Sequence, residues 1–445
     1  MSQTLDAMAA FVAGCDPPAA ARARAAGAVM DTIGVALAGA GEPAARIVRE
    51  TIGASEAGGC AVWGARVRYA PGDAALANGT AAHALDYDDM CFVSLAHPSA
   101  PLVPAIIAAA EVANAPGRAV LDAYVAGFEV QARLGRLMNP AHYQRGWHCT
   151  STLGTMSAAA GVARVLGLDA ATTAHALSIA ASSASGLKEN FGTMVKPLHA
   201  GTAARDGVMA AFLAKGGLTG SATALDGPQG YLHALGSERT DLAGETADLG
   251  RRWEILDTGI TVKLYPSCAG THPALDALLD LIVEYGVTAS DVDRIDIDVD
   301  PIVPTILIYD RPTTALEAKF SLPFCAAAAA VFGRVGIDTF EDVVIRDPRV
   351  TALMSRVTMR VDDQIGRGKP ALTESRVRVT LKDGRAVVKD AHGARGYPSN
   401  PASEADLAAK FLACAARGRS TTEAAAILTR LGTLDHLESI RDLGA

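Results

Sequence analysis

The chain has 445 residues, of which 50% are hydrophobic and 5% aromatic, and its net charge is −8. This length predicts two or three domains with a sizeable core, and the acidic balance argues against nucleic acid as the main partner. It leaves a small anionic substrate open, because the local field of a pocket can oppose the net charge.

Helical periodicity dominates the first 220 residues, which show no convincing strand pattern. A helix that begins at Pro17 and runs through Leu37 carries apolar residues three and four positions apart. Another helix begins at Pro197, directly after Lys196, continues on small residues and ends before Gly217. The helices predicted in this part cover residues 5–13, 17–37, 43–52, 73–85, 98–113, 117–137, 148–166, 169–184 and 197–215.

The pattern changes after residue 258. Alternation with a period of two predicts strands at 294–299, 357–361, 376–381 and 385–389. Asp383-Gly384, between the last two strands, predicts a type I′ hairpin turn. The helices predicted in this part cover residues 272–285, 314–332, 339–344, 403–415 and 421–431.

These elements predict a mainly α protein with an α+β part. We expect a large all-helical domain formed by residues 1–268 and 396–445, to which the last helices return. A smaller α+β domain with an antiparallel sheet would cover residues 269–395.

The chain shows no sign of export or of membrane insertion. Its seven cysteines include no C-x-x-C pair and fit neither a zinc ribbon nor a disulfide framework. The N-terminus lacks the basic region and the apolar run of a signal peptide. Apolar stretches are interrupted well before the roughly 18 residues that a membrane span needs. We therefore expect a cytoplasmic protein without a membrane partner.

Four helix starts carry an ionisable side chain that can hold or transfer a proton. These side chains are His97, His148, Lys196 and His272. If several of these starts face one cavity, their backbone N–H groups, imidazoles and lysines would bind a di- or tricarboxylate and exchange protons with it. Each could equally be an isolated helix start, since the sequence does not show convergence.

An acidic cluster follows the helix that ends near His83. It contains Asp86, Asp88 and Asp89, with His97 further on. Such side chains could ligate Zn, Mn or Fe, although no His or Glu pair at i, i+4 and no H-E-x-x-H supports a metal. Alternatively the cluster is solvated or caps a helix, or Asp86 orients a catalytic group.

Two cysteines lie close to histidines in the sequence. Cys268 precedes His272, and Cys149 follows His148. A thiolate–imidazole pair is one interpretation, and an inert buried thiol is the other. The chain contains no G-x-S-x-G, no P-loop, no G-x-G-x-x-G and no alternation of basic and aromatic residues. Hydrolase, NTPase, Rossmann and nucleic-acid interpretations therefore have no support from a motif.

A series of motifs resembles the MmgE/PrpD family. In chain order the motifs are His83–Asp89 with His97-Pro-Ser, Gly146-Trp-His148, Lys196-Pro-Leu-His-Ala-Gly201, Lys263–Cys268 with Thr271-His272, and Gly396-Tyr-Pro-Ser-Asn-Pro401. The series covers nearly the whole chain at compatible spacing. The family includes 2-methylcitrate dehydratase, cis-aconitate decarboxylase and iminodisuccinate epimerase. The resemblance implies a homodimer without metal or organic cofactor, and an active site between a helical domain and an α+β lid.

The resemblance also implies the residues of the site. Catalytic candidates are Asp86, His97, His148, Lys196, Lys263 and Cys268, and substrate-binding candidates are Lys196, Lys263, Tyr87, His272 and Phe324. No metal ligand is expected. Relative to the decarboxylases of the family, Cys268 replaces a histidine, Phe324 a tyrosine and Met90 a threonine. These replacements remove polar contacts and argue against cis-aconitate itself as the substrate.

The predicted function is a cofactor-independent lyase, a dehydratase or decarboxylase, that acts on a small 2-methylcitrate-like or aconitate-like acid by proton transfer next to a carboxylate. Lys196 and Lys263 would anchor carboxylates, and His97 or His148 would carry the proton. Asp86 would fix an imidazole tautomer or act as a base.

The alternative is an epimerase of an iminodisuccinate-type dicarboxylate, with Cys268 as the second base. A third interpretation, a helical binding protein, predicts that the polar residues scatter over the surface. His199 is expected to be a packing residue of the first helical turn.

Overall fold

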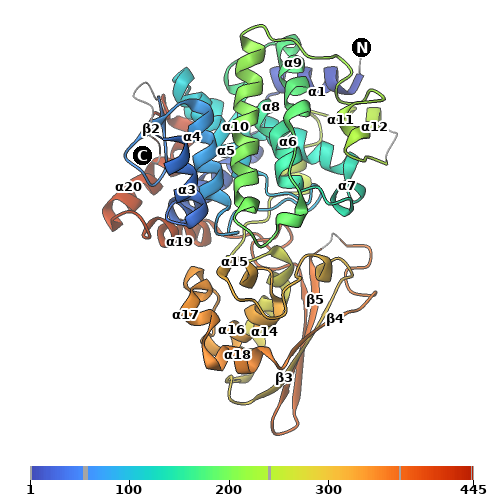
Figure 1. Ribbon diagram of the computed structural model, residues 1–445, viewed down its shortest axis with the longest axis vertical. Helices are drawn as coiled ribbons and strands as arrows, with labels where there is room; N and C mark the ends of the chain where they lie inside the picture. Colours follow the sequence, from blue (N-terminus) through green and yellow to red (C-terminus); the bar gives the residue numbers. More distant parts are fainter. Residues whose placement is uncertain (1–2, 54–58, 239–241, 370–371, 442, 444–445) are drawn as a thin grey trace. The chain divides into compact units, whose positions relative to one another are not determined.

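The computed structural model describes residues 3–53, 59–238, 242–369, 372–441 and 443. The chain divides into two compact units, residues 1–262 with 403–445 and residues 263–402 (Figure 1). A mainly α protein with an α+β part, as predicted, is confirmed. Among the described helices, none is both long enough and apolar enough to cross a membrane.

The boundary segments 263–268 and 396–402 were predicted to belong to the helical domain, and the structure groups both with the second unit. Hydrogen bonds explain this grouping. The Arg395 guanidinium donates to the Tyr265 hydroxyl at 2.7 Å, and the Tyr397 hydroxyl donates to the Ala269 carbonyl at 2.8 Å.

The first unit is built from helices. Its longer helices are α1 (Gln3–Gly14), α2 (Ala19–Gly39), α3 (Pro43–Ile52), α4 (Pro71–His83), α5 (Ser99–Ala113), α6 (Gly117–Met138), α8 (Cys149–Val165), α9 (Ala170–Ser183), α10 (Val195–Lys215), α19 (Glu404–Ala415) and α20 (Thr421–Gly432). Its short elements are α7 (Ala141–Gln144), α11 (Tyr231–Ala234), α12 (Leu242–Thr246), α13 (Glu254–Asp257), the 3-10 turns η1 (Lys188–Asn190) and η5 (Leu434–His436), and the ribbon β1 (Cys60–Ala61) and β2 (Arg68–Tyr69).

Helices α4 and α10 pack closely because glycines meet at their crossing. A Cβ added to Gly79 would lie 2.9 Å from Gly201 Cα, and one added to Gly72 would lie 3.5 Å from Met209 Sδ. Early residues of α4 thus meet late residues of α10, so the helices run antiparallel. The end of α4 consequently lies at the start of α10, which carries Lys196.

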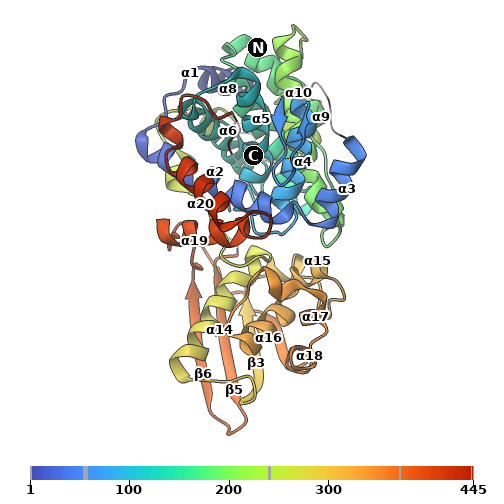
Figure 2. The ribbon, with the colours of Figure 1, turned by 90° about the vertical axis from the view of Figure 1, so that its left-hand side faces the viewer.

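Helices α19 and α20, red in Figures 1 and 2, return to the first unit and pack on α2. A Cβ on Gly34 of α2 would lie 2.8 Å from the ring of Phe411. Ser403 begins α19 with a capping box, in which its hydroxyl accepts from the Asp406 N–H at 3.1 Å. The contact between Phe411 and Gly34 holds this C-terminal segment, which is remote in sequence, against the N-terminal helix α2.

The second unit holds a four-stranded sheet in the order β4-β3-β5-β6. The strands are β3 (Val292–Val299), β4 (Val357–Val361), β5 (Glu374–Leu381) and β6 (Ala386–His392). Its helices are α14 (His272–Tyr285), α15 (Ala315–Ala318), α16 (Leu322–Phe332), α17 (Asp342–Ile345) and α18 (Pro348–Met354), with 3-10 turns η2 (Ala269–Thr271), η3 (Val303–Thr305) and η4 (Ile337–Phe340). Helix α14 packs on β5 and β6, and α16 packs on α14 and β4.

The antiparallel prediction holds for β3–β5, with Ile297 opposite Val377, and for β5–β6. Strand β4 instead pairs parallel to β3, with Met359 opposite Ile297. The chain between them passes through α15 to α18, and such a crossover connection brings the next strand back in the same direction.

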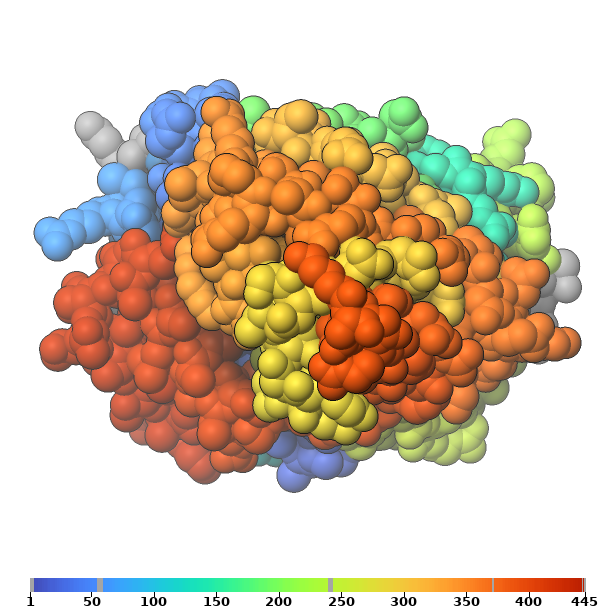
Figure 3. All heavy atoms as spheres, turned by 90° about the horizontal axis from the view of Figure 1, so that it is seen from below, coloured from blue at the N-terminus to red at the C-terminus, as the bar shows by residue number. Residues whose placement is uncertain are grey.

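Two local predictions are corrected. The helix predicted over 314–332 is interrupted after Ala318, because the Ser321 hydroxyl accepts from the Phe324 N–H and caps a new helix. The β5–β6 turn is not type I′, since Gly384 has φ +88° but Asp383 does not adopt positive φ. The Asp383 carboxylate accepts from the Arg385 N–H at 3.0 Å instead. Figure 3 shows this hairpin, in orange-red, beside the yellow end of α14.

Candidate active site

Three helix starts of the first unit converge, as the convergence interpretation predicted. His97 lies two residues before α5, His148 is the residue before α8, and Lys196 lies in the first turn of α10. The Lys196 Nζ donates to Asp86 Oδ1 at 2.6 Å, and His97 Nε2 lies 3.8 Å from the same oxygen. The His97 N–H donates to Thr150 Oγ1 in the first turn of α8 at 3.1 Å.

We call this group the histidine cluster. It consists of His83, Asp86, Asp88, His97, His148, Lys196 and His199. The His83 ring centroid lies 4.6 Å from that of His97 and 5.8 Å from that of His148. All members except the half-buried His199 are buried. The scatter over the surface that a binding protein would show is therefore not observed for these residues.

Asp86 adopts a backbone conformation that few side chains tolerate. Its φ is +51°, in the left-handed region, where aspartate is accepted more readily than bulky residues. Its N–H donates to the His83 carbonyl at 3.2 Å and turns the chain at the end of α4. The turn brings Asp86 to Lys196 at the start of α10.

His83 and Asp88 form a buried dyad. The Nδ1 of His83 lies 2.8 Å from Asp88 Oδ2. Burial lowers the pKa of His83 to about 3, although Asp88 opposes the shift, so the ring is neutral and Nδ1–H donates. Burial would raise the pKa of Asp88, but the His83 and His97 imidazoles and their hydrogen bonds hold it well below its usual range.

This donation fixes the tautomer of His83, so Nε2 bears the lone pair. Nε2 has no hydrogen-bond partner among the described residues. The dyad therefore presents a neutral nitrogen acceptor inside the cluster.

His148 and His199 are joined through their rings, with Nδ1 atoms 3.0 Å apart. Burial, followed by the charge of Lys196, lowers the pKa of His148 well below its usual range and that of His199 to about 4. Both rings are therefore neutral at pH 7, and one Nδ1–H donates to the other. The prediction that His199 is a packing residue is corrected, because this hydrogen bond makes it a partner of His148.

Asp89 has a different role from its neighbours. Its carboxylate accepts from the Ser99 N–H at 3.1 Å and from the Ser99 hydroxyl, which also lies 2.6 Å from the Tyr124 hydroxyl. Burial raises the pKa of Asp89 to about 8. Because Ser99 is the first residue of α5, its two hydrogen bonds to Asp89 cap this helix. This is the helix-capping role that the sequence left open for the acidic cluster.

Four members could together contact a cation. His83, Asp86, Asp88 and His97 each offer a ligand atom, and these atoms lie within 4.8 Å of one another. Imidazole and carboxylate ligands suit divalent transition metals. However, the Lys196 ammonium already lies 2.6 Å from Asp86 Oδ1. Its charge would repel a divalent ion at this position.

Four other predicted site residues, Lys263, Cys268, His272 and Phe324, belong to the second unit. Lys263, its first residue, is buried, and the Cys268 N–H donates to the Lys319 carbonyl at 3.0 Å. His272 Nε2 lies 3.2 Å from the Ser267 carbonyl oxygen, and its ring meets Tyr265 edge to face. These contacts hold the segment that carries Cys268.

Four positions singled out from the sequence remain, Phe324, Tyr87, Met90 and Cys149. Phe324 is fully buried, with its ring centroid 5.7 Å from that of Phe340. Tyr87 is half-buried, and the Met90 N–H donates to the Thr261 carbonyl at 2.9 Å. Burial raises the pKa of the Cys149 thiol to about 12, which makes a thiolate next to His148 unfavourable.

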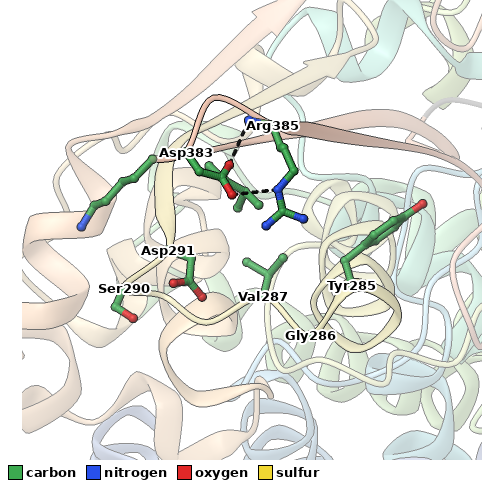
Figure 4. Close-up of a pocket in the computed structure, with 9 residues that line it drawn as sticks. Tyr285, Gly286, Val287, Ser290, Asp291, Asp383 and Arg385 are labelled. Atoms are coloured by element: carbon green, nitrogen blue, oxygen red, sulfur yellow. Dashed lines mark hydrogen bonds and ion pairs between the residues drawn. The ribbon is translucent and has the colours of Figure 1, made fainter.

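A separate hollow of about 200 Å³ lies between the end of α14 and the β5–β6 hairpin (Figure 4). It is lined in part by Tyr285, Asp383 and Arg385. The exposed Arg385 Nε donates to Asp383 Oδ2 at 2.7 Å. This pair stabilises the turn, and the hollow contains none of the predicted site residues.

The sequence interpretation missed the roles of His83, Asp88 and His199. His83 and Asp88 are five residues apart across a helix end, and both lie in a motif that carried the family resemblance. The spacing was a usable signal, because the residue that ends a helix can bond to a carboxylate in the following turn. No comparable local signal pairs His199 with His148, which are 51 residues apart.

Comparisons with known proteins show which family this chain resembles. Residues 5–241 match the MmgE/PrpD N-terminal domain, and residues 265–434 match the MmgE/PrpD C-terminal domain. The cis-aconitate decarboxylase of Homo sapiens is 30% identical over 391 residues, which cover 85% of this chain and 79% of the human protein. That of Mus musculus is 28% identical over 428 residues, 92% of this chain and 86% of the mouse protein. That of Aspergillus terreus is 26% identical over 385 residues, 81% of this chain and 78% of the fungal protein.

Proposed function

The chain belongs to the MmgE/PrpD family, and on that premise we propose that it is a lyase that acts on a small aconitate-like or 2-methylcitrate-like carboxylate without a metal or organic cofactor. The observation that carries the proposal is that the side chains of His97 and Lys196 both lie beside the buried carboxylate of Asp86. Lys196 Nζ lies 2.6 Å and His97 Nε2 3.8 Å from Asp86 Oδ1. A fixed ammonium and a proton carrier are the two parts that proton transfer beside a carboxylate needs.

His97 is the proposed proton carrier. Its Nδ1 lies 3.2 Å from Asp88 Oδ2, while its Nε2 faces Asp86. The positive charge that this ring gains on taking up a proton would be stabilised by both carboxylates. His148 suits the role less well, because burial and Lys196 hold its pKa well below the usual range. We propose that His148 stays neutral and positions substrate.

Lys196 is the proposed anchor of the substrate carboxylate and the stabiliser of the developing enediolate. In decarboxylation the C–C bond breaks, carbon dioxide leaves, and the electron pair remains on carbon until the His97 imidazolium delivers a proton. In dehydration a base removes the proton next to the carboxylate, and the electron pair then expels hydroxide with help from an acid. Both routes need the same ammonium and the same imidazole.

The relatives support decarboxylation of an aconitate-like acid, since those cited are named cis-aconitate decarboxylases. Cys268, Phe324 and Met90 stand where we expect polar side chains in those enzymes. We therefore propose a related acid rather than cis-aconitate itself. Lys263 and Cys268 are proposed contributors on the resemblance to the family.

The epimerase alternative rests on Cys268, which would serve as a second base. Proton NMR in D₂O separates the reactions when the enzyme is incubated with cis-aconitate, 2-methylcitrate and aminodicarboxylates. Dehydration creates a new vinyl signal, and decarboxylation changes the vinyl pattern with release of carbon dioxide. Epimerisation exchanges a C–H for deuterium without a vinyl signal. Absence of all three reactions would contradict the proposed function.

Lys196→Met tests the anchor. We expect a loss of activity of at least about 10²-fold, because the variant removes charge stabilisation in a buried site. Lys215→Met, at the exposed end of the same helix, is the matched control and should retain activity. Full turnover by Lys196→Met would overturn the assignment of this residue.

Removal of metal tests cofactor independence. Dialysis against EDTA should leave the rate unchanged, since Lys196 rather than a divalent ion supplies the positive charge beside Asp86. A rate lost on dialysis and restored by Zn²⁺, Mn²⁺ or Fe²⁺ would instead assign the four potential ligands of the histidine cluster to a metal.

A further inference from the structure

The loop that carries Asp86 and Asp88 is held by a residue from the far end of the chain. Lys410, on α19, donates from Nζ to the Tyr87 carbonyl oxygen at 2.8 Å. The same Nζ lies 4.1 Å from the centre of the Tyr87 ring. Tyr87 thus receives a hydrogen bond and a cation–π contact from one buried ammonium.

A buried aspartate holds this ammonium from the other side. Lys410 Nζ lies 2.7 Å from Asp31 Oδ1 of α2, and the two side chains are 3% and 1% exposed. Burial raises the pKa of Asp31, and Lys410 opposes the shift. Removing two charges from water costs about as much as their attraction returns, so such a pair contributes little net stability. Its effect is to fix the position of the lysine.

Tyr87 lies between the two carboxylates of the histidine cluster. The preceding residue, Asp86, has φ +51° and binds Lys196, and the following residue, Asp88, binds His83. A hydrogen bond to the Tyr87 carbonyl fixes the peptide plane that joins Tyr87 to Asp88. Movement of this plane would turn both carboxylates relative to His97.

We propose that Lys410 is a positioning residue of the active site, which holds the 86–88 loop through the Tyr87 carbonyl so that both carboxylates face His97. The proposal rests on the proposed function insofar as it concerns turnover. Lys410 does not belong to the cluster and acts through Tyr87. Helix α19, by returning to the first unit, thereby takes part in holding the site.

A neighbouring residue provides a control for simple packing. Phe411 is 1% exposed and packs against Gly34, so it fastens α19 to the same helix that Asp31 occupies. Phe411→Leu should lower thermal stability while leaving Lys410 in contact with Tyr87. If α19 matters only as a packing element, Phe411→Leu and the Lys410 variants should behave alike.

The Lys410 variant must not leave Asp31 as an unpaired buried charge, which would endanger the fold. We therefore combine Asp31→Asn with Lys410→Met, which removes both charges at nearly constant volume. The double variant should stay folded and lose about 10²-fold in kcat, the effect expected of a misplaced catalytic group. Its KM should change less than about threefold, because the Lys196 anchor is intact. Asp31→Asn alone also leaves one buried charge without its partner, so it is measured at a temperature at which it is folded; it keeps the Tyr87 hydrogen bond and should retain most of the rate.

Imidazole NMR tests the positioning independently of any substrate. In the double variant the ¹⁵N ring resonances of His83 and His97, assigned from His83→Gln and His97→Gln, should shift, whereas in Phe411→Leu they should not. Unchanged ring resonances together with an unchanged kcat in the folded double variant would overturn the proposal. If the wild type turns over no carboxylate, the proposed function fails, and the ring resonances alone decide whether Lys410 positions the loop.

Discussion

His97 lies between two carboxylates that each bind a second cationic or imidazole group. Asp86 Oδ1 accepts from Lys196, and Asp88 Oδ2 accepts from His83. A proton held by His97 is therefore stabilised from both ring nitrogens, while the neighbouring histidines stay neutral. At the residue scale this difference in environment distinguishes His97, the proposed proton carrier, from the neutral hydrogen-bonding histidines around it.

The first prediction concerns His97. His97→Gln should lower kcat by about 10² to 10⁴-fold, which is the usual contribution of a general acid or base. Its melting temperature should stay close to that of the wild type, because the glutamine amide can occupy the space of the ring. The exposed His233 supplies the control, and His233→Gln should keep the full rate. Wild-type turnover by His97→Gln would assign the proton to another residue.

The neutral histidines predict how stability depends on pH. The pKa of His83 is lowered to about 3 and that of His199 to about 4, from an unfolded value of 6.5. Between these values the two histidines bind more protons in the unfolded chain than in the native protein, so their contribution favours unfolding as the pH falls, whereas the raised pKa of Asp89 acts in the opposite sense. The stabilisation that these neutral histidines contribute is fully present above about pH 6.5 and is lost progressively towards pH 3.

Melting temperatures measured from pH 8 to pH 4 should therefore contain a decrease below about pH 6.5 that is due to these histidines. In His199→Gln the decrease should be shallower, because one of the groups that bind protons on unfolding is missing. The same slope in His199→Gln and in the wild type would contradict a depressed pKa for this residue.

At the element scale, small residues bring the helix starts of the histidine cluster together. A Cβ on Gly201 would overlap Thr80 Oγ1 and the Leu76 carbonyl oxygen of α4. The overlap involves backbone, which cannot move aside as a flexible side chain would. The close approach of α10 and α4 therefore sets the distance from Lys196 to Asp86.

Gly201→Ala should consequently destabilise the protein by about 1–3 kcal/mol, as overpacking does. It should also lower kcat, because α10 must move away from α4 and carry Lys196 with it. Gly216→Ala is the control, since its added Cβ would lie no closer than 3.4 Å to Leu213 O and Phe212 O. Denaturant unfolding and steady-state kinetics measure both effects. A Gly201→Ala variant with wild-type stability and rate would show that the crossing can relax.

Element prediction was successful where the pattern was local and periodic. The helix over 43–52 and the strand over 357–361 were predicted with the limits that the structure has. The start of α10 was predicted two residues late, at Pro197 instead of Val195, because proline tolerates several positions in the first turn. The direction of β4 was wrong, since strand periodicity carries no information about the partner strand.

At the scale of the whole molecule, the resemblance to the family implies a homodimer, which we propose for this chain. Met209 and Leu213 lie one turn apart on α10 and are 46% and 40% exposed, and the nearby Leu218 is 49% exposed. Apolar residues gathered on one helix face are typical of a surface that is covered by a partner. We propose a second copy of the chain as that partner.

Sedimentation analysis should give twice the chain mass of 45.7 kDa. Met209→Glu combined with Leu213→Glu should shift the protein towards the monomer, because burial of two carboxylates opposes association. Val283→Glu, at an 83% exposed position on α14, serves as the control and should leave the dimer intact. A wild-type monomer at micromolar concentration would contradict the proposal.

The sequence by itself determined the helical class, the α+β part and a list of polar residues at helix starts, because periodicity, capping and family motifs are local along the chain. Only the tertiary structure decided which of these residues meet. It joined Asp86 to Lys196 across 110 positions and Tyr87 to Lys410 across 323. It also separated Asp89, which caps a helix, from Asp86 and Asp88, which face His97. The physical reason is that burial and a partner's charge set the role of an ionisable group, and both arise only when distant helices pack together.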